Sequence, residues 1–338
     1  MSETLRGHRR NALRTLSAAA AVGATGPWIA ARAQAPRVIR LAHHVSLQSE
    51  QQKTAESFAR LLGQYTGGAI EVRVLPAAQM GGQREIIESV SLGTLEMGYG
   101  ESGLYGNYLP RFGVVALPYL YRDFAHWEKV VDGPIGAALA ADLQKSRAGL
   151  RIVNWMTAGY RDTYLRTKPI ARPDDFRGVK IRLPEAPLFV RTFQALGAQP
   201  TPIPAPEMYS ALQTGVVDAM EGSPEVGYTF KIHEVTRYLS RTRHILLDGS
   251  FVIGNKLYDS LPKDHQAALD RAARESATLQ RKEHFERETS WMNRFRSESK
   301  LVINDVDLKP FAERLAPLHA DFANAAKASD IVAAIKAA

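Results

Sequence analysis

Two arginines at the ends of predicted strands are the residues whose type and position best suit anion binding. Val179 and Ile181 alternate with charged residues in the stretch 176–184, which predicts a short strand with Arg182 at its carboxyl end. Ligands of open α/β sheets bind beyond the carboxyl ends of strands, and the planar guanidinium matches a carboxylate with two hydrogen bonds. Arg161 begins a neighbouring predicted strand. The positions suggest a carboxylate site, although either arginine taken alone is more often a surface residue or an ion-pair partner.

One glycine-rich match is excluded as a nucleotide site. Residues 98–103 read G-x-G-x-x-G, and Asp123 lies twenty residues beyond them. In a dinucleotide-binding fold these glycines open a helix whose N-terminus holds the pyrophosphate. Gly106 and Pro110 interrupt any such helix within about two turns. We interpret the pattern as small residues that let the backbone approach a crevice.

No catalytic or metal-binding motif is complete in the sequence. His233-Glu234 begins like H-E-x-x-H, but Arg237 replaces the second histidine. His43 and His44 are adjacent near a strand end and point to opposite faces, which argues against a shared metal ion. The absence of cysteine excludes disulfides, thiolate metal sites and a cysteine nucleophile. We therefore expect no metal and no cofactor, and a glycosidase-like pair of carboxylates is the enzymatic alternative that stays open.

The first 33 residues predict an export signal. Four arginines and one glutamate precede an uncharged, alanine-rich stretch at 15–30, and an Ala31-Arg32-Ala33 cleavage site follows. Arg9-Arg10 also resembles a twin-arginine signal, with an ordinary export signal as the alternative. This segment carries +4 of the net charge of +8, so the mature chain lacks the strong basic character typical of nucleic-acid binding. We expect a soluble periplasmic protein of about two domains.

The mature chain alternates predicted strands and helices. Its first part has strands at 38–42, 70–74 and 94–99, with helices at 51–62 and after Gly81-Gly82. This order indicates a mostly parallel sheet covered by helices. After a connection at 105–122, helices are predicted at 124–145, 187–196 and 206–215, and strands at 150–155, 161–166, 179–183, 216–220 and within 235–248. A long helical stretch from Pro262 to about Ser299 exceeds what one small domain needs, which suggests that it crosses between domains.

Nine short motifs follow one another over nearly the whole mature chain. They are Thr66–Pro76, which begins Thr66-Gly67-Gly68, then Gln79–Glu85, Leu92–Met97, Leu117–Asp123, Gly133–Gly136, Phe176–Pro184, Leu196–Ala198, Glu207–Tyr209 and Ala211–Asp218. In this order they resemble the substrate-binding proteins of tripartite ATP-independent periplasmic (TRAP) transporters. Each motif alone is weak, and their shared order makes the resemblance specific.

The resemblance implies an α/β, two-lobed fold like that of other periplasmic binding proteins. Each lobe would be a mostly parallel sheet flanked by helices, with one long helix spanning both. Residues 1–33 would be the signal peptide, 34–158 plus about 248–286 lobe I, and 159–247 plus about 287–338 lobe II. Such a protein is expected to be a receptor and not an enzyme. A ligand that contacts both lobes shifts the hinge equilibrium toward the closed form.

The resemblance also implies roles for individual residues. Arg182, in the K-x-R-x-P stretch, would clamp the ligand carboxylate, and Arg161 would support it. Glu221 would either take a ligand hydroxyl or face another protein group. Many relatives have an asparagine before Pro224, where this chain has Gly222-Ser223. Further expected ligand-binding residues are Ser223, Gln48, Ser49, Glu50, Gln79, Tyr209 and Trp155.

The expected ligand is a small organic acid. Uronic or aldonic sugar acids are favoured, ahead of 2-oxo or 2-hydroxy acids and C4-dicarboxylates. The expected partners are the membrane subunits of a TRAP transporter, with no nucleic acid, and we expect a monomer. Two other classes stay open: a secreted hydrolase using paired carboxylates, and a receptor for an ABC transporter or a sensor kinase.

Overall fold

The sheet that organises the protein contains ten strands. The computed structural model describes residues 35–338, and the predicted signal peptide at 1–33 lies outside the described residues. The strands are β1 (Arg37–Ala42), β2 (Ile70–Leu75), β3 (Met97–Glu101), β4 (Leu150–Ile152), β5 (Met156–Leu165), β6 (Lys180–Leu183), β7 (Gln199–Pro202), β8 (Ala219–Gly222), β9 (Tyr238–Gly254) and β10 (Val302–Asp305). Their order is β2-β1-β3-β9-β5-β8-β6-β7, and β4 and β10 also pair with β9.

Two parallel sets of strands are joined by antiparallel pairing into this single sheet. In the first set β1 is parallel to β2 and β3, and in the second β6 is parallel to β7 and β8. The 17-residue strand β9 runs antiparallel to both β3 and β5, and β5 is antiparallel to β8. The carboxyl ends of β1 and β3 and of β6 are therefore the edges where a ligand site is expected. The predicted α/β class is confirmed.

Helices cover the sheet. They are α1 (Glu50–Tyr65), α2 (Gln83–Leu92), α3 (Ser102–Tyr105), α4 (Phe124–Asp132), α5 (Pro134–Lys145), α6 (Pro187–Ala195), α7 (Met208–Thr214), α8 (Pro224–Thr229), α9 (Ile232–Val235), α10 (Asn255–Asp259), α11 (Lys263–Glu298), α12 (Lys309–Ala325) and α13 (Ser329–Ala337). Short 3-10 helices lie at Pro110–Ala116, Pro173–Phe176 and Ala205–Glu207. No helix among residues 35–338 combines the length and apolar character that crossing a membrane requires.

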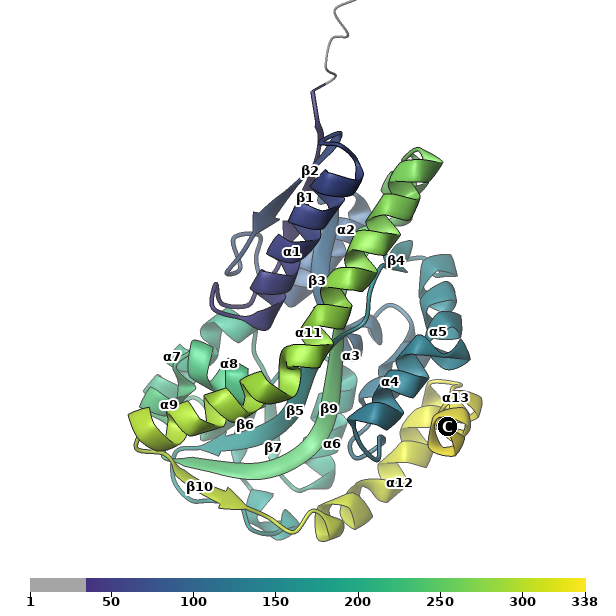
Figure 1. The fold of residues 1–338 in the computed structure, drawn as a ribbon. Helices are drawn as coiled ribbons and strands as arrows, with labels where there is room; N and C mark the ends of the chain where they lie inside the picture. The colour runs from purple at the N-terminus through teal and green to yellow at the C-terminus, as the bar shows by residue number, and fades with distance from the viewer. Residues whose placement is uncertain (1–34) are drawn as a thin grey trace, which may run out of the picture. The chain divides into compact units, whose positions relative to one another are not determined.

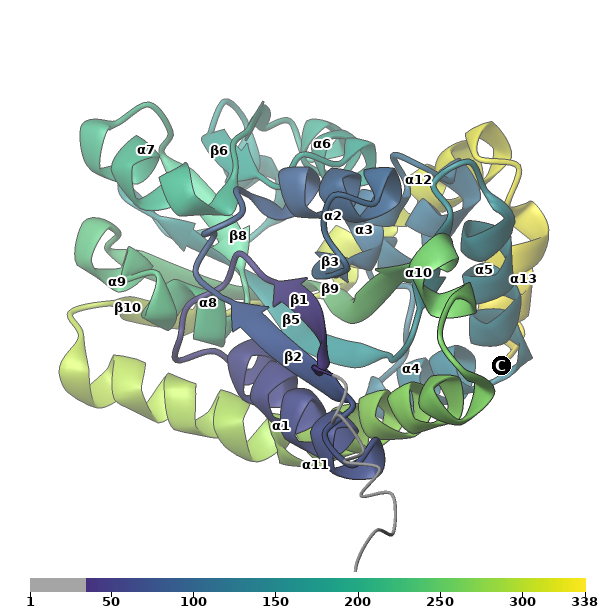
Figure 2. The same cartoon turned by 90° about the horizontal axis from the view of Figure 1, so that it is seen from above.

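The 36-residue helix α11 confirms the long helix predicted at 262–299. It packs along α1 and reaches α8 (Figures 1 and 2). Its first half adds Leu269 and Ala273 to the apolar cluster around β1 and α1, whereas Met292 and Phe295 join the cluster around α7. One helix thus contributes to two separate cores, which agrees with a span across two lobes. The exact division of the chain between lobes stays a prediction.

Some predicted boundaries are wrong. The single helix expected at 124–145 is two, because Gly133 lies between α4 and α5 and Pro134, whose fixed φ suits a first helical position, begins α5. The strand expected at 150–155 ends at Ile152. The one or two strands expected within 235–248 are the single strand β9, which continues to Gly254.

Candidate ligand-binding site

A cavity lies where the carboxyl ends of the two parallel strand sets meet. It has about 500 Å³ of space between protein atoms, part of which is open solvent. His44 follows β1, Glu101 ends β3, Arg161 lies in β5 and Arg182 in β6. The remaining wall is formed by Val45, Gln83, Leu104, Pro184, Glu185, Pro204, Ala205, Met208, Val226 and Phe230. The cavity therefore combines apolar walls with convergent polar and charged groups, as small-molecule sites do.

Arg182 is buried in this cavity without an acidic partner. Its side chain donates from Nε to the carbonyl oxygen of Ile203 at 2.7 Å, and the residue is 4% exposed. Within residues 35–338 its terminal nitrogens make no hydrogen bond, and no carboxylate oxygen lies within 4.0 Å of it. Burial, reinforced by the nearby Arg161, lowers the pKa of Arg182 to about 10, although Glu221 opposes this shift. The guanidinium is thus a desolvated cation whose outer nitrogens are available to an anion.

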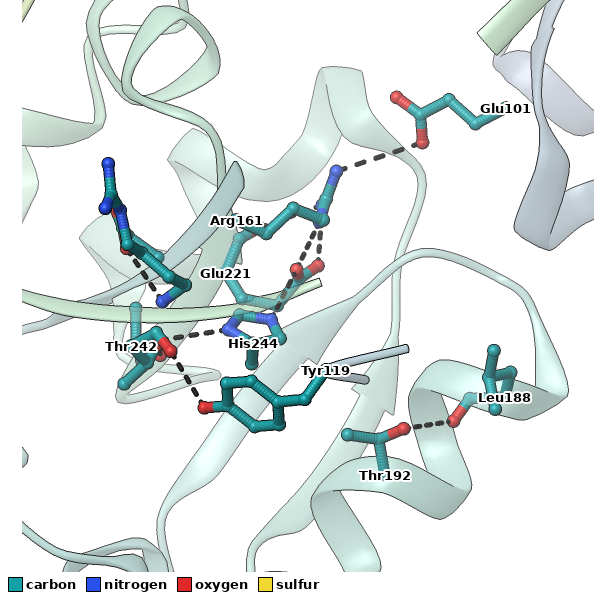
Figure 3. A network of polar contacts seen from close by, with 11 residues as sticks. Glu101, Tyr119, Arg161, Leu188, Thr192, Glu221, Thr242 and His244 are labelled. Atoms are coloured by element: carbon teal, nitrogen blue, oxygen red, sulfur yellow. Dashed lines mark hydrogen bonds and ion pairs between the residues drawn. The ribbon is translucent and has the colours of Figure 1, made fainter. Parts of the chain in front are cut away.

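Arg161 is held by a buried network. Its Nη2 donates to Glu221 Oε1 at 2.7 Å, and its Nε donates to Glu221 Oε2 (Figure 3). His244 Nε2 lies 3.2 Å from the same Oε2, and Thr242 Oγ1 lies 2.9 Å from His244 Nδ1. The bidentate pair comes from β5 and β8, which are neighbours in the sheet. It fixes the guanidinium so that Nη1 lies 3.9 Å from Glu101 Oε2, at the cavity.

The electrostatics of this network follow from burial and pairing. Burial alone would raise the pKa of Glu221, but Arg161 and then His244 outweigh it and hold this pKa at about 2. Burial alone would lower the pKa of Arg161, but Glu221 and Glu101 raise it. Burial lowers the pKa of His244, which keeps the imidazole neutral near pH 7. Arg161 and Glu221 therefore compensate each other inside the protein.

The structure brings together only part of the residue set expected from the sequence. Arg182 and Arg161 line the cavity. Glu221 does not line it, because both carboxylate oxygens face Arg161 and the residue is fully buried. The expectation that Glu221 faces another protein group thus describes its position. Ser223 is buried beside the start of α8, outside the cavity wall.

The three expected site residues that follow β1, Gln48, Ser49 and Glu50, lie outside the cavity wall. Gln48 is exposed, and Ser49 caps α1 by accepting from the backbone nitrogen of Gln52 at 3.1 Å. Glu50 is buried against α11, where it accepts from Gln280 Nε2 at 2.8 Å. None of these three lines the cavity.

Three further expected residues also lie outside the cavity wall. Gln79 is exposed in the loop after β2. Tyr209 donates from its hydroxyl to Glu234, and the Trp155 ring stacks on Phe112 with a centroid distance of 5.9 Å. Their aromatic rings serve packing in this structure.

Four polar residues of the cavity wall were not expected from the sequence: Gln83, Glu185, His44 and Glu101. Burial, with His43 and then the two arginines, lowers the pKa of His44 to about 3, so this ring is neutral and stacks on Tyr99. Burial raises the pKa of Glu101, although Arg161 opposes the shift. Both residues stand at carboxyl ends of parallel strands, the signal that pointed to Arg182. No cluster of three metal-ligating side chains occurs among residues 35–338.

The fold and the cavity together are those of a receptor-like protein, in which a buried arginine without an acidic partner among residues 35–338 lies between two strand sets. Comparison with known families gives its family. The model described as bacterial extracellular solute-binding protein, family 7, matches residues 41–325, so the chain belongs to this family. The family is one of solute receptors rather than of enzymes, and the resemblance to TRAP substrate-binding proteins is confirmed.

Individual relatives agree with this assignment. The chain is 31% identical over 281 residues to the 2,3-diketo-L-gulonate-binding periplasmic protein of Escherichia coli strain K12, covering 83% of this chain and 85% of the relative. It matches, with a TM-score of 0.86 and 29% identity, a TRAP periplasmic solute-binding protein of Sulfitobacter sp. NAS-14.1 with bound β-D-galacturonate, covering 89% and 100% of the two chains. It also matches one of Polaromonas sp. JS666 bound to D-erythronate, with a TM-score of 0.85, 29% identity and coverage of 89% and 98%.

Proposed function

We propose that this protein is a periplasmic receptor that binds a sugar acid between its two lobes and delivers it to the membrane subunits of a TRAP transporter. The observation that carries the proposal is Arg182, a buried guanidinium in the cavity that no carboxylate of the described chain neutralises. A desolvated, uncompensated cation is costly, and a ligand carboxylate would remove that cost. Three of the similar proteins are named for 2,3-diketo-L-gulonate, galacturonate and erythronate, which are hydroxylated acids.

The polar groups of the cavity suggest how such a ligand is oriented. The carboxylate pairs with the terminal nitrogens of Arg182, and Arg161 Nη1 adds a second positive edge. Glu101 then accepts hydrogen bonds from ligand hydroxyls, and neutral His44 either donates or accepts one. Glu101 would repel a second carboxylate, which favours sugar acids over C4-dicarboxylates as the ligand. A 2-oxo or 2-hydroxy acid is the next choice.

Closure completes binding. With 34–158 and about 248–286 as lobe I, and 159–247 and about 287–338 as lobe II, His44 and Glu101 belong to lobe I and the two arginines to lobe II. A ligand that contacts both sets stabilises the closed form more than the open form, and so shifts the hinge equilibrium. The protein performs no chemistry on the ligand, uses no cofactor or metal, and acts as an exported monomer that does not bind nucleic acid.

The experiment is a calorimetric titration of the mature chain, residues 34–338, with a panel of acids. D-Galacturonate, D-erythronate and 2,3-diketo-L-gulonate represent sugar acids, pyruvate and lactate the smaller acids, and succinate the dicarboxylates. At least one sugar acid should bind in a saturable way and be recovered unchanged. Saturable binding of succinate alone would contradict the sugar-acid assignment. A glycoside or an ester of a sugar acid is added to the panel, and its hydrolysis would indicate a hydrolase.

A further inference from the structure

Two buried acidic residues, Glu50 and Glu225, contact each other between α1 and α8, outside the ligand cavity. Glu225 Oε1 accepts a hydrogen bond from the backbone nitrogen of Glu50 at 2.6 Å. Glu50 is 4% exposed and Glu225 is 8% exposed. The predicted division places Glu50 in lobe I and Glu225 in lobe II. The bond therefore joins the two lobes, between residues that are 175 positions apart in the sequence.

Of the two carboxyl groups, only that of Glu50 has polar side chains close to it. Glu50 Oε2 accepts from Gln280 Nε2 at 2.8 Å and lies 3.5 Å from His284 Nδ1, both on α11. Within residues 35–338 no lysine or arginine nitrogen comes within 4.0 Å of either carboxyl. The remaining titratable groups that face Glu225 are more distant: Lys53 on α1, Arg287 on α11 and Tyr99 on β3. Glu225 is thus an acid buried next to another acid.

Burial, and next the proximity of Glu50, raises the pKa of Glu225 to about 8, although the backbone bond from Glu50 and the charges of Arg287 and Lys53 oppose the shift. If the lobes separate, this carboxyl enters water, where glutamate titrates at about pH 4.3. Between these two values the closed form binds more protons than the open form. Closure is then favoured at low pH and is weakened as the pH rises toward 8.

We propose that Glu225 is a proton-dependent clasp whose neutral carboxyl holds the two lobes closed, so that ligand affinity falls as the pH rises. This inference rests on the proposed function, because it requires a receptor that closes around its ligand. One linked proton changes affinity by up to tenfold per pH unit inside the window. The neutral His44 and the ligand carboxylate, which titrates near pH 4, do not contribute above pH 6.

The central variant is Glu225→Gln, which keeps an oxygen acceptor for the backbone nitrogen of Glu50 but cannot ionise. Its matched control is Asp248→Asn, because Asp248 is another buried acid with a pKa raised by burial, to about 7. Asp248 accepts from Ser102, and both residues belong to lobe I in the predicted division, so this contact does not cross between lobes. Calorimetry with D-galacturonate would be run from pH 6 to pH 8.5 for the natural protein and both variants.

The natural protein should bind at least tenfold more weakly at pH 8.5 than at pH 6. Glu225→Gln should give a flat profile and bind more tightly than the natural protein at pH 8.5, and Asp248→Asn should keep the natural slope. A natural profile without pH dependence, or an unchanged slope in Glu225→Gln, would overturn the clasp.

A second measurement separates failure of the clasp from failure of the proposed function. The chain has no cysteine, so Leu92→Cys and Val216→Cys, at positions that are 72% and 57% exposed, would accept a pair of spin labels, one on each predicted lobe. Without any ligand, the distance between labels should shorten from pH 8.5 to pH 6, and Glu225→Gln should abolish the change. If this shift occurs but no sugar acid binds at any pH, the proposed function fails and the clasp stands. If a sugar acid binds and the distance ignores pH, the clasp fails.

Discussion

Two arginines line the same cavity, are almost equally buried, and lie in opposite electrostatic settings. Arg161 is 3% exposed and Arg182 is 4% exposed. Arg161 is bonded to Glu221 in a bidentate pair, and the acids around it raise its pKa. Among residues 35–338, Arg182 bonds only a backbone carbonyl, and burial lowers its pKa to about 10. Within residues 35–338 the protein thus pairs one buried cation with an acid and gives the other no acidic partner.

The difference separates positioning from binding. A buried ion pair contributes little net stability, because desolvation offsets the attraction, but removing one partner is strongly destabilising. The Arg161–Glu221 pair therefore fixes the orientation of the Arg161 guanidinium at the cavity. Under the proposed function, the uncompensated Arg182 lowers the stability of the ligand-free protein and gains a partner when the ligand binds. Each of the following experiments tests this contrast.

The largest effect is expected from Arg182→Ala. Two charge-assisted hydrogen bonds are worth about 3–6 kcal/mol together, so sugar-acid affinity should fall by about a hundredfold to ten-thousandfold. Thermal stability without ligand should stay the same or rise, because an uncompensated buried charge is removed. Calorimetry and a melting curve measure both quantities. Arg182→Lys, which keeps the charge but not the planar fork, should lose less affinity. Undiminished affinity in Arg182→Ala would refute the clamp.

In contrast to Arg182, substitution of Arg161 should mainly lower the stability of the folded protein. Arg161→Met or Glu221→Leu alone leaves an uncompensated buried charge and should cost about 3–5 kcal/mol of unfolding free energy. The double variant removes both charges and should be more stable than either single variant. Urea unfolding at pH 7 provides the three values. If the double loss equals the sum of the single losses, the two residues do not act as a pair.

The same pair predicts a specific response to acid. The pKa of Glu221 is about 2 in the folded protein, below the usual value near 4.5, so the unfolded chain binds the proton more readily. The stability that this group contributes is fully present above pH 4.5 and is lost as the pH falls toward 2. The shift corresponds to about 3 kcal/mol. Unfolding measured between pH 5 and pH 2.5 should therefore show a shallower loss in the Arg161→Met/Glu221→Leu variant than in the natural protein.

The position of Arg182 at a strand end could be predicted from the sequence. Alternation around Val179 and Ile181 placed Arg182 at a strand end, and the strand-end rule placed it in a site. The partner of Arg161 could not be chosen from sequence, because it depends on pairing between β5 and β8, which brings Thr163 opposite Glu221 across 58 residues of chain. Local periodicity carries no information on that register.

Glu101 and His44 could not be predicted as cavity residues for the same reason. Glu101 and His44 reach the cavity only because β9 connects β3 to β5 and so brings two strand sets to a common edge. Gln48 and Ser49, expected from the family resemblance, lie at the start of α1, where one is exposed and the other caps the helix. Loop positions of this kind depend on tertiary contacts and not on residue pattern.

The smallest effect is expected from Glu101→Gln. Glu101 Oε2 lies 3.9 Å from Arg161 Nη1. Because Glu101 lines the same cavity as Arg182, it adds a carboxylate to the cavity wall. The variant replaces a charged acceptor by a neutral one and should weaken galacturonate binding by about tenfold, or ~1.4 kcal/mol. It also removes repulsion of a second carboxylate, so the affinity for succinate relative to galacturonate should increase. Glu96→Gln, a carboxylate paired with Arg40 outside the cavity, serves as the control and should change neither affinity. An unchanged ratio of the two affinities in Glu101→Gln would show that Glu101 does not select the ligand, and selection would then lie with the arginines alone.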